Sequence, residues 1–246
     1  MPAPRARLIG PGRAGGAFAT ALDAVGWEVT GVLGRPDDVA GAARDVELLL
    51  IATPDAAIAS VAAAVEPVPT TVVAHVAGSL GLDVLAPHPR RGALHPLLPL
   101  PDATVGATRL RGGAWFAVAG DPLVERVVRD LGGRSFAVAD EARPAYHAAA
   151  AIASNHLVAI LGQAERVALA AGVPFEAYLD LVQATVDNVR ALGPAAGPVS
   201  AAARGDWATI ERHRAALAVE ELAAYDALVE LARRLVEPPD PAGDDG

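Results

Sequence analysis

Residues 7–25 read RLIGPGRAGGAFATALDAV, and this stretch decides the fold. Residues 7–10 have the character of a short apolar strand, and residues 14–25 repeat apolar side chains at helical spacing. Between them, Gly10, Gly12 and Gly15 form the pattern G-x-G-x-x-G. In that pattern the first glycine permits a tight turn, the second lets the backbone approach a pyrophosphate, and the third lets the helix pack closely on the strand. The stretch therefore predicts a dinucleotide-binding βα unit; a glycine turn that serves packing alone is the alternative.

The residues that follow the motif indicate which dinucleotide would bind. The predicted helix begins near Arg13, so the backbone amides of Arg13 and Ala14 would face the phosphates at the positive end of the helix dipole. Arg35 lies about 20 residues after the motif, where such proteins contact the ribose 2′ position. Arginine suits a 2′-phosphate and favours NADP(H), whereas Asp37 and Asp38 nearby leave NAD(H) open.

Apolar strands alternate with helices as far as residue 140. The predicted strands cover 27–33, 46–54, 70–78, 114–120 and 134–139, and the predicted helices between them cover 55–65 and 121–131. The run VELLLIATP at 46–54 is apolar almost throughout, as is typical of a strand buried on both faces of a parallel sheet. We predict a doubly wound, mostly parallel α/β sheet of the Rossmann type over residues 1–140.

The remainder of the chain differs in character. Residues 141–237 show only helical patterns, which predict an all-α domain; its assignment to substrate binding and dimerisation comes from the family resemblance given below. Residues 238–246 are rich in proline, glycine and aspartate, a composition that predicts a disordered tail.

Composition excludes several classes of chemistry. The chain has 246 residues, no cysteine and no lysine, so thiolate, disulfide and Schiff-base chemistry are excluded. Its formal net charge is −9 without a basic stripe, which argues against nucleic-acid and anionic-membrane partners. No spanning apolar run or signal peptide is recognisable, so we expect a cytoplasmic protein. The six histidines are scattered, and we expect no metal site.

Histidine is the natural proton donor near neutral pH once lysine and cysteine are excluded. His95 lies in GALHPLLPL, which reads as a proline-bracketed loop over the cofactor cleft. His147 lies on a helix that begins near residue 143. We assign His95 and His147 to catalysis, with a structural role as the alternative for each. His88 and His213 have the surroundings of loop and surface histidines.

Strand ends supply further candidates, because ligands of open α/β sheets bind at the carboxyl ends of the strands. Thr53 and Pro54 end the run at 46–54, and His75 ends the strand predicted at 70–78. We assign all three to cofactor binding and Ser79, in the next turn, to substrate binding. The alternative for His75 is a side chain satisfied by backbone groups.

A polar row on an otherwise Ala/Ile/Leu helix completes the candidate site. His147 and Ser154 are spaced to eclipse one another in an α-helix, and Asn155 is close to that face. At 1.5 Å per residue, His147 and Asn155 are separated by about 12 Å. One would donate a proton, as a catalytic residue, while the other anchors a carboxylate or the nicotinamide amide, and Ser154 would contact substrate.

Arg204 could bind a substrate carboxylate bidentately. The simpler interpretation of this segment is a helix start, with Asp206 as the N-cap and Arg204 in the preceding loop.

With these residues in place, the chain resembles Rossmann-like proteins with a DUF2520 helical domain, of the 6-phosphogluconate dehydrogenase-like superfamily. They are relatives of ketopantoate reductase and pyrroline-5-carboxylate reductase. The matching stretches include GPGRAGGAFATAL, LLLIATPDAAIASVA, VVAHVAGSLGLDVL, GALHPLLPL, YHAAAAIASNHLVAIL and RGDWATIERH.

The resemblance implies an NADP(H)-dependent reductase of a small 2-oxo acid, with ketopantoate (2-dehydropantoate) as the named substrate in pantothenate biosynthesis. It also implies a homodimer formed through the helical domains. Reduction of a cyclic imine such as pyrroline-5-carboxylate, or dinucleotide binding without turnover, are the alternatives. One departure matters: the superfamily commonly places a lysine four residues before the asparagine that Asn155 matches, and this chain has Ala151 there.

Overall fold

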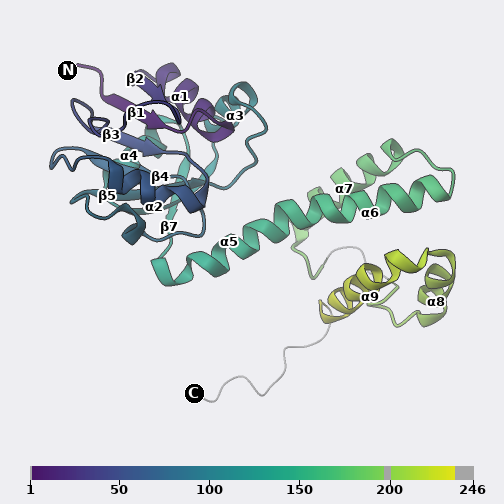
Figure 1. Cartoon of the computed structure of the whole chain (residues 1–246). Helices are drawn as coiled ribbons and strands as arrows, with labels where there is room; N and C mark the ends of the chain where they lie inside the picture. The colour runs from purple at the N-terminus through teal and green to yellow at the C-terminus, as the bar shows by residue number, and fades with distance from the viewer. Residues whose placement is uncertain (1, 197–200, 236–246) are drawn as a thin grey trace, which may run out of the picture. The chain divides into compact units, whose positions relative to one another are not determined.

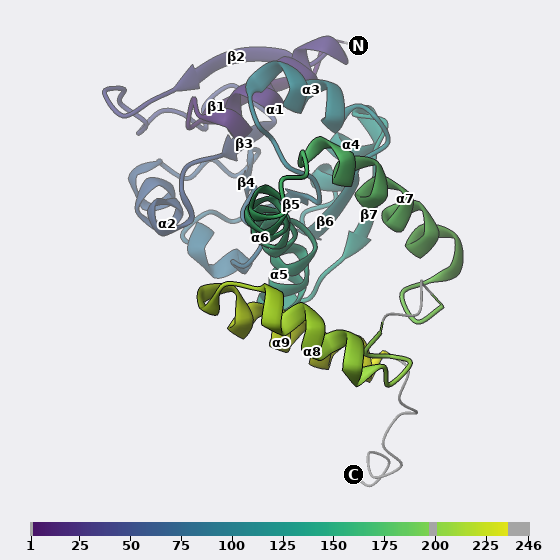
Figure 2. The same ribbon diagram turned by 90° about the vertical axis from the view of Figure 1, so that its right-hand side faces the viewer.

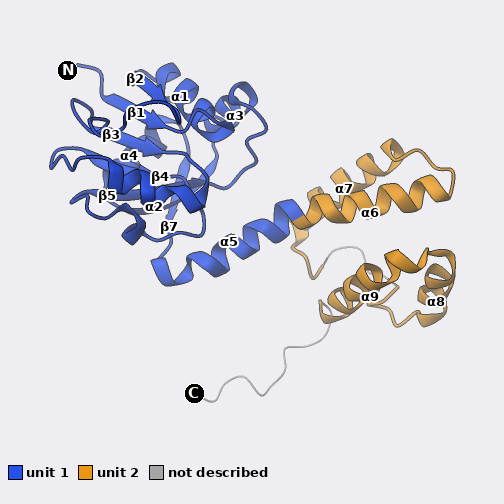
Figure 3. Cartoon of the chain, viewed as in Figure 1, with its two compact units in different colours: residues 1–155 blue, residues 156–246 orange. Residues whose placement is uncertain are grey.

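The computed structural model describes residues 2–196 and 201–235, and the chain divides into two compact units, residues 1–155 and 156–246 (Figure 3). The sequence prediction places this boundary at residue 140. Helix α5 (Arg143–Ala151) nevertheless belongs to the first unit, because side chains such as Tyr146 contact the sheet at His95. The predicted tail, residues 238–246, lies outside the described residues.

The first unit is built on a seven-stranded sheet with the order β2-β1-β3-β4-β5-β6-β7 (Figure 1). Its strands are β1 (Arg5–Ile9), β2 (Glu28–Leu33), β3 (Leu48–Ile51), β4 (Val72–His75), β5 (Arg91–Pro96), β6 (Trp115–Gly120) and β7 (Arg134–Ala137). Neighbouring strands are parallel except β5 and β6, which are antiparallel. The predicted mostly parallel Rossmann sheet, followed by a helical region, is confirmed.

The main error of the sequence prediction concerns β5 and the helix after it. The segment GALHPLLPL, predicted as a loop, contributes the end of β5, and His95 lies within that strand. Gly92, Ala93 and Leu94 are buried there between β4 and β6. Pro96 is the last residue of β5, so proline ends the strand without interrupting it. Helix α3 (Ala103–Leu110) follows and was also not predicted.

Helices cover both faces of the sheet with separate apolar clusters. Helices α1 (Arg13–Ala24), α3 and α4 (Leu123–Asp130) pack on one face, and α1 lies beside α3 (Figure 2). Helix α2 (Asp55–Ala64) and the 3₁₀ turn η1 (Leu82–Leu85) pack on the other. Along β3, Leu48 and Leu50 join the first cluster, whereas Leu49 and Ile51 join the second. This strand is therefore buried on both faces, as its unbroken apolar pattern predicts.

One histidine departs from its predicted surroundings. His88, predicted as a loop or surface histidine, is 2% exposed, and its Nε2 lies 2.9 Å from the carbonyl oxygen of Ala62 on α2. A single histidine in a loop sequence carries no signal for such burial, which depends on how that loop folds back over α2. His213 is exposed, as predicted, and its Nδ1 lies 2.7 Å from the Tyr225 hydroxyl.

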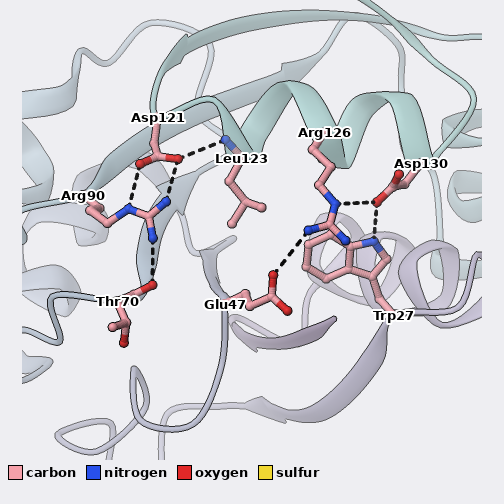
Figure 4. Close-up of polar contacts among 8 residues, drawn as sticks. All are labelled: Trp27, Glu47, Thr70, Arg90, Asp121, Leu123, Arg126 and Asp130. Atoms are coloured by element: carbon pink, nitrogen blue, oxygen red, sulfur yellow. Dashed lines mark hydrogen bonds and ion pairs between the residues drawn. The ribbon is translucent and has the colours of Figure 1, made fainter. Parts of the chain in front are cut away.

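Ion pairs hold the edge of the sheet where the parallel strands begin (Figure 4). Arg90 binds both carboxylate oxygens of Asp121, at 2.8 and 3.1 Å, and donates to the carbonyl of Thr70. The Leu123 amide donates to the same carboxylate at 3.0 Å. Burial alone would raise the pKa of Asp121, but the hydrogen bonds from Arg90 and Leu123 outweigh it and lower that pKa.

A second group of contacts continues along this edge toward β2. The indole Nε1 of Trp27 donates to Asp130 at 3.0 Å, and Arg126 lies between Asp130 and Glu47 (Figure 4). Trp27 and Glu47 directly precede β2 and β3. The polar network therefore occupies the amino ends of the parallel strands and leaves their carboxyl ends to other side chains.

The second unit contains α6 (Leu157–Ala170), α7 (Glu176–Leu192), α8 (Trp207–Ala216) and α9 (Val219–Arg234). A π-helical turn (Ile152–His156) precedes α6. Arg166 on α6 pairs with Glu221 on α9 at 2.6 and 3.0 Å. Asp206 caps α8 by accepting the Thr209 amide, so the predicted cap is confirmed. Among the described residues, none of the helices combines the length and the apolar character that crossing a membrane requires.

The Arg90–Asp121 contact leads to a stability prediction. Replacing Asp121 by Asn should lower the free energy of unfolding at neutral pH by about 1–2 kcal/mol, because the Arg90 guanidinium loses its charged partner. Since folding lowers the Asp121 pKa, the difference from wild type should be complete above about pH 5 and shrink as the pH falls below about 4. Urea unfolding across pH measures it.

Glu125→Gln is the matched control, because Glu125 is exposed on α4 and lies 3.9 Å from Arg129. Equal losses for the two variants would contradict a specific role for the Asp121 carboxylate.

Candidate functional site

The glycine motif adopts the geometry that its spacing predicts. Gly10 has φ +108°, and a Cβ there would lie 2.6 Å from the carbonyl oxygen of Ala52. A Cβ on Gly15 would overlap the carbonyl of Gly10, so α1 can pack this closely only without a side chain. At Gly12, by contrast, a Cβ would meet nothing within 4 Å. Gly10 and Gly15 thus bring strand and helix together, and Gly12 leaves open space at the helix N-terminus.

That space belongs to a cleft of about 560 Å³ at the carboxyl ends of β1, β3 and β5. Three segments line it, one following each strand: Gly12, Arg13 and Ala14; Ala52, Thr53 and Pro54; and Pro99, Leu100 and Pro101. Sequence reasoning identified the first two segments. It missed the third, because the fold places residues 99–101 opposite the glycine turn only once β5 and α3 are formed.

Two sets of hydrogen-bonding groups at the cleft have no protein partner in the described structure and could bind a ligand. Helix α1 has no side-chain cap at Gly12, so amides of its first turn are left to a ligand or solvent. The Thr53 hydroxyl is buried and has no hydrogen-bond partner in the described structure. Open space above Gly12, free helix amides and an unpaired hydroxyl together fit the pyrophosphate of a dinucleotide.

The turn after β2 bears on which dinucleotide fits. Asp37 accepts a hydrogen bond from the Gly34 amide at 2.6 Å, and Asp38 accepts one from the Ala40 amide at 2.9 Å. Both carboxylates therefore shape their own turn. Arg35 is exposed in the same turn, which adjoins the glycine motif because a Cβ on Gly34 would lie 3.4 Å from Pro11.

His75 is fully buried at the end of β4, and the chain itself satisfies both ring nitrogens. Nδ1 accepts the Ala77 amide at 3.2 Å, so Nε2 carries the proton and donates to the Gly81 carbonyl at 3.2 Å. Burial, as the largest effect, lowers the pKa of His75. This neutral imidazole holds residues 76–81 in place, and it is not among the residues that line the cleft.

His95, Tyr146 and His147 form a polar aromatic cluster between β5 and α5. His95 Nδ1 lies 2.7 Å from the Tyr146 hydroxyl, and the His95 and His147 ring centroids are 5.6 Å apart. The structure thus brings together the two histidines assigned to catalysis. It adds Tyr146, which the sequence analysis missed although it directly precedes His147. Phe136 on β7 packs against Tyr146 with ring centroids 5.8 Å apart, which fixes the phenol.

His95 and Tyr146 are both uncharged at neutral pH, because each has a shifted pKa. Burial, followed by the electrostatic effects of the neighbouring His147 and Arg143, lowers the pKa of His95 to about 4. The expectation that His95 titrates near neutrality is therefore wrong, because the strand encloses a side chain that a loop would have left in solvent. Burial raises the pKa of Tyr146, so its hydroxyl keeps its proton.

The cluster adjoins the cleft at two points. His95 lies on β5, which leads directly into the cleft-lining residues 99–101. Asp55 follows the cleft-lining Pro54, lies 3.4 Å from the Ser79 hydroxyl, and is close enough to act on the pKa of His95. Ser79, predicted to contact substrate, is thus in contact with Asp55, the residue that connects the cleft-lining segment at Pro54 with the His95 cluster.

Arg143 and Asp140 lie at the start of α5. The Arg143 side chain is fully buried, and its Nε lies 3.3 Å from Asp140 Oδ1. The other oxygen of that carboxylate accepts the Leu82 amide at 3.0 Å. The two terminal nitrogens of Arg143, and also His147 Nδ1, are buried without a hydrogen-bond partner in the described structure.

Three further residues belong to the predicted site: Ser154, Asn155 and Arg204. Ser154 and Asn155 fall in the π-helical turn, where the α-helical spacing that would eclipse His147 and Ser154 no longer holds. Asn155 is exposed. Arg204 is exposed in the second unit, in the turn before α8. No group of three or more metal-ligating side chains occurs among the described residues.

Comparisons with known proteins agree with this architecture. Residues 35–101 match the model of a Rossmann-like domain, and residues 117–232 match DUF2520, a domain of unknown function. Among curated proteins, none matches this sequence.

Solved structures share the fold at low identity. A candidate NADP oxidoreductase from Bacteroides fragilis superposes with a TM-score of 0.80 at 19% identity, over 96% of this chain and 99% of that one. The reductive aminase of Aspergillus terreus gives a TM-score of 0.70 at 18% identity, over 94% of each chain.

The pyrroline-5-carboxylate reductase of Streptococcus pyogenes gives a TM-score of 0.60 at 15% identity, over 95% of this chain and all of that one. This likeness shows a shared fold, and the two domain matches identify the chain as a protein with a Rossmann-like domain and a DUF2520 domain.

Proposed function

We propose that this chain is an NADP(H)-dependent reductase of a small carbonyl or imine compound that carries a carboxylate. The observation that carries the proposal is the cleft at Gly12, where open space, uncapped α1 amides and the unpaired Thr53 hydroxyl converge. When bound there, the dihydronicotinamide supplies a hydride. Gly12, Arg13 and Ala14 would hold the pyrophosphate, and Thr53 and Pro54 would line its path toward the His95 cluster.

NADP(H) is favoured over NAD(H) by the turn after β2. An NAD-binding protein normally offers a carboxylate to the ribose 2′-hydroxyl. Here Asp37 and Asp38 both accept backbone hydrogen bonds within their own turn, whereas Arg35 is exposed beside the glycine motif. The names of the structural neighbours, an NADP oxidoreductase and a reductive aminase bound to NADPH or an NADPH analogue, support the same preference.

Tyr146 is the proposed proton donor. Its hydroxyl retains its proton at neutral pH and would transfer it to the substrate oxygen or nitrogen that gains negative charge. Neutral His95 can then donate a hydrogen bond from Nδ1–H to the phenolate oxygen 2.7 Å away, until a proton from solvent restores the Tyr146 hydroxyl. His147 and Ser79 would orient the substrate beside Tyr146 and His95.

The proposed substrate is a 2-oxo acid, with ketopantoate as the specific candidate that the sequence resemblance supplies. A cyclic imine is the second candidate, favoured by neighbours named as reductive aminase, imine reductase and pyrroline-5-carboxylate reductase. In either case hydride adds to the carbon of the double bond, and Tyr146 protonates the other atom of that bond, which is oxygen in a ketone and nitrogen in an imine.

We also propose a homodimer formed through the second unit. Within its described residues, the buried apolar side chains are Ala168, Ala202 and Ile210, too few for a core of its own. Leu179, Val182, Val186 and Val189 instead recur at helical spacing along one face of α7, and three of them are about 40% exposed or more. A second copy of the same helix is the occupant that an apolar, helix-length stripe of this kind suits.

The cofactor proposal predicts that Gly12→Val abolishes NADPH binding without loss of stability. Gly12 has φ −70°, which any residue adopts, and a Cβ there meets no protein atom within 4 Å. The new side chain would instead fill the pyrophosphate space. Calorimetric titration with NADPH and thermal unfolding measure the two effects.

Gly31→Val on the edge strand β2 is the matched control, because Gly31 also has open space around its Cβ position. NADPH binding unchanged in Gly12→Val would rule out the proposed cofactor site.

The mechanism predicts that Tyr146→Phe lowers kcat by about 100-fold, because the substrate loses its proton donor. In wild type, kcat should stay level between about pH 6 and pH 9, since His95 is neutral above its pKa of about 4 and the raised Tyr146 pKa keeps the phenol protonated. NADPH oxidation with ketopantoate and with pyrroline-5-carboxylate measures both and distinguishes the two substrate classes.

Tyr178→Phe, on α7, controls for loss of a tyrosine hydroxyl elsewhere. A rate that falls as the pH rises through 6–7 would point to an imidazolium donor instead. Tight NADPH binding without turnover of any substrate would leave a dinucleotide-binding protein without catalysis.

The dimer proposal predicts that Val186→Glu shifts the protein toward monomers in sedimentation velocity, because a carboxylate would enter the apolar stripe of α7. Ala184→Glu places the same charge about half a turn away and should leave the wild-type association state unchanged. A monomeric wild-type protein at micromolar concentration would refute the dimer.

A further inference from the structure

We propose that Arg143 binds the substrate carboxylate, a role that sequence reasoning gave to Arg204. This inference rests on the proposed function for the identity of the ligand, but the anion site itself is argued from Arg143 and its neighbours.

The first argument is the unmet hydrogen-bonding capacity of a buried charge. The Arg143 side chain is 0% exposed, yet among the described residues its one polar contact runs from Nε to Asp140 at 3.3 Å. Both terminal nitrogens lack a partner within the part of the chain that the structure describes. A guanidinium is always charged, and a buried charge is costly unless paired. These nitrogens also form the planar fork that binds a carboxylate through two parallel hydrogen bonds.

The second argument is the position of Arg143 on α5. His147 lies four residues later, on the same face of the helix, and its buried Nδ1 is also unpartnered. His147 faces the segment after β4, where Gly78 leaves room for its ring, and Arg143 is close enough to His75 at the end of β4 to act on the pKa of that histidine. His147 is partly exposed whereas Arg143 is not, so His147 forms the outer end of this row and Arg143 the inner end.

The third argument is the charge around the row. His75 and His95 are held neutral by burial, and the Tyr146 phenol keeps its proton. Asp140 is the carboxylate in contact with Arg143, and it also binds the Leu82 amide; Asp55 contacts Ser79 instead. The positive charge of Arg143 acts on His75, His95 and Tyr146 alike. A bound carboxylate would supply the missing negative charge next to the proposed proton donor.

Arg204 suits this task less well. It is exposed in the turn before α8, where water screens its charge. A guanidinium enclosed by protein binds a carboxylate more selectively. Little water competes for either charge, and the surrounding protein holds the guanidinium in one geometry.

The test uses oxamate, an analogue of a 2-oxo acid that carries the carboxylate, and ethyl oxamate, its uncharged ester. Each is titrated calorimetrically into the full chain, with and without NADP⁺. Oxamate should bind wild type more tightly than the ester does, and Arg143→Met should weaken oxamate binding by about 10-fold or more while leaving the ester unchanged. Arg129→Met, on the exposed face of α4, is the control for loss of an arginine.

Stability and cofactor binding separate the possible failures. If Arg143 serves a ligand, Arg143→Met should keep a melting temperature at or above that of wild type, because methionine removes a buried charge whose two terminal nitrogens have no partner in the described structure. NADP⁺ should still bind this variant. A lower melting temperature with unchanged oxamate affinity would overturn the proposal in favour of a structural role. Failure of NADP⁺ binding to wild type would instead count against the proposed reductase.

A second readout needs no variant at Arg143. Oxamate should shift the imidazole proton resonances of His147 and His95 in wild type, assigned through His147→Gln, and ethyl oxamate should not. Equal shifts for the acid and the ester would also overturn the proposal, because the response would then not depend on the carboxylate.

Discussion

The close approach of α1 to β1 is the constraint on which the rest of this site depends. Gly10 sits against the Ala52 carbonyl with φ +108°, and Gly15 sits against the Gly10 carbonyl, so neither position has room for a side chain. This contact fixes the first turn of α1 beside the carboxyl end of β3. Because the helix begins there without a side-chain cap, its free amides and the buried Thr53 hydroxyl face one cleft. The close contact at Gly10 and Gly15 thus both packs α1 on the sheet and forms the candidate binding cleft.

The amino ends of the parallel strands carry stabilising ion pairs, whereas their carboxyl ends carry the candidate site. At the amino ends of the parallel strands, Arg90 and Asp121 are paired with each other and with backbone groups. At the carboxyl ends, polar atoms of Thr53, His147 and Arg143 are buried without partners. Buried polar groups in folded proteins are almost always hydrogen-bonded, and these are the atoms that the proposed cofactor and substrate would satisfy.

The polar cluster also shows how burial changes the chemistry of a residue. A histidine in a loop would titrate near neutrality, but His95 lies in β5 between two strands. Burial there, followed by the electrostatic effects of His147 and Arg143, lowers its pKa to about 4. The same enclosure raises the pKa of Tyr146. Burial thus moves the candidate proton donor from the imidazole to the phenol, and His95 becomes the group that supports Tyr146.

The sequence alone determined the Rossmann sheet, the glycine turn and the burial of β3 on both faces, because each depends on local spacing: glycines at fixed positions, an unbroken apolar run, and helical periodicity. It did not reveal β5, since Pro96 suggested a loop until the pairing with β4 and β6 was visible. Nor could it reveal Tyr146, Arg143 or the cleft wall at residues 99–101. Those assignments depend on which side chains the folded chain encloses together, and contacts between residues as far apart in sequence as His95 and Tyr146 leave no periodic signal.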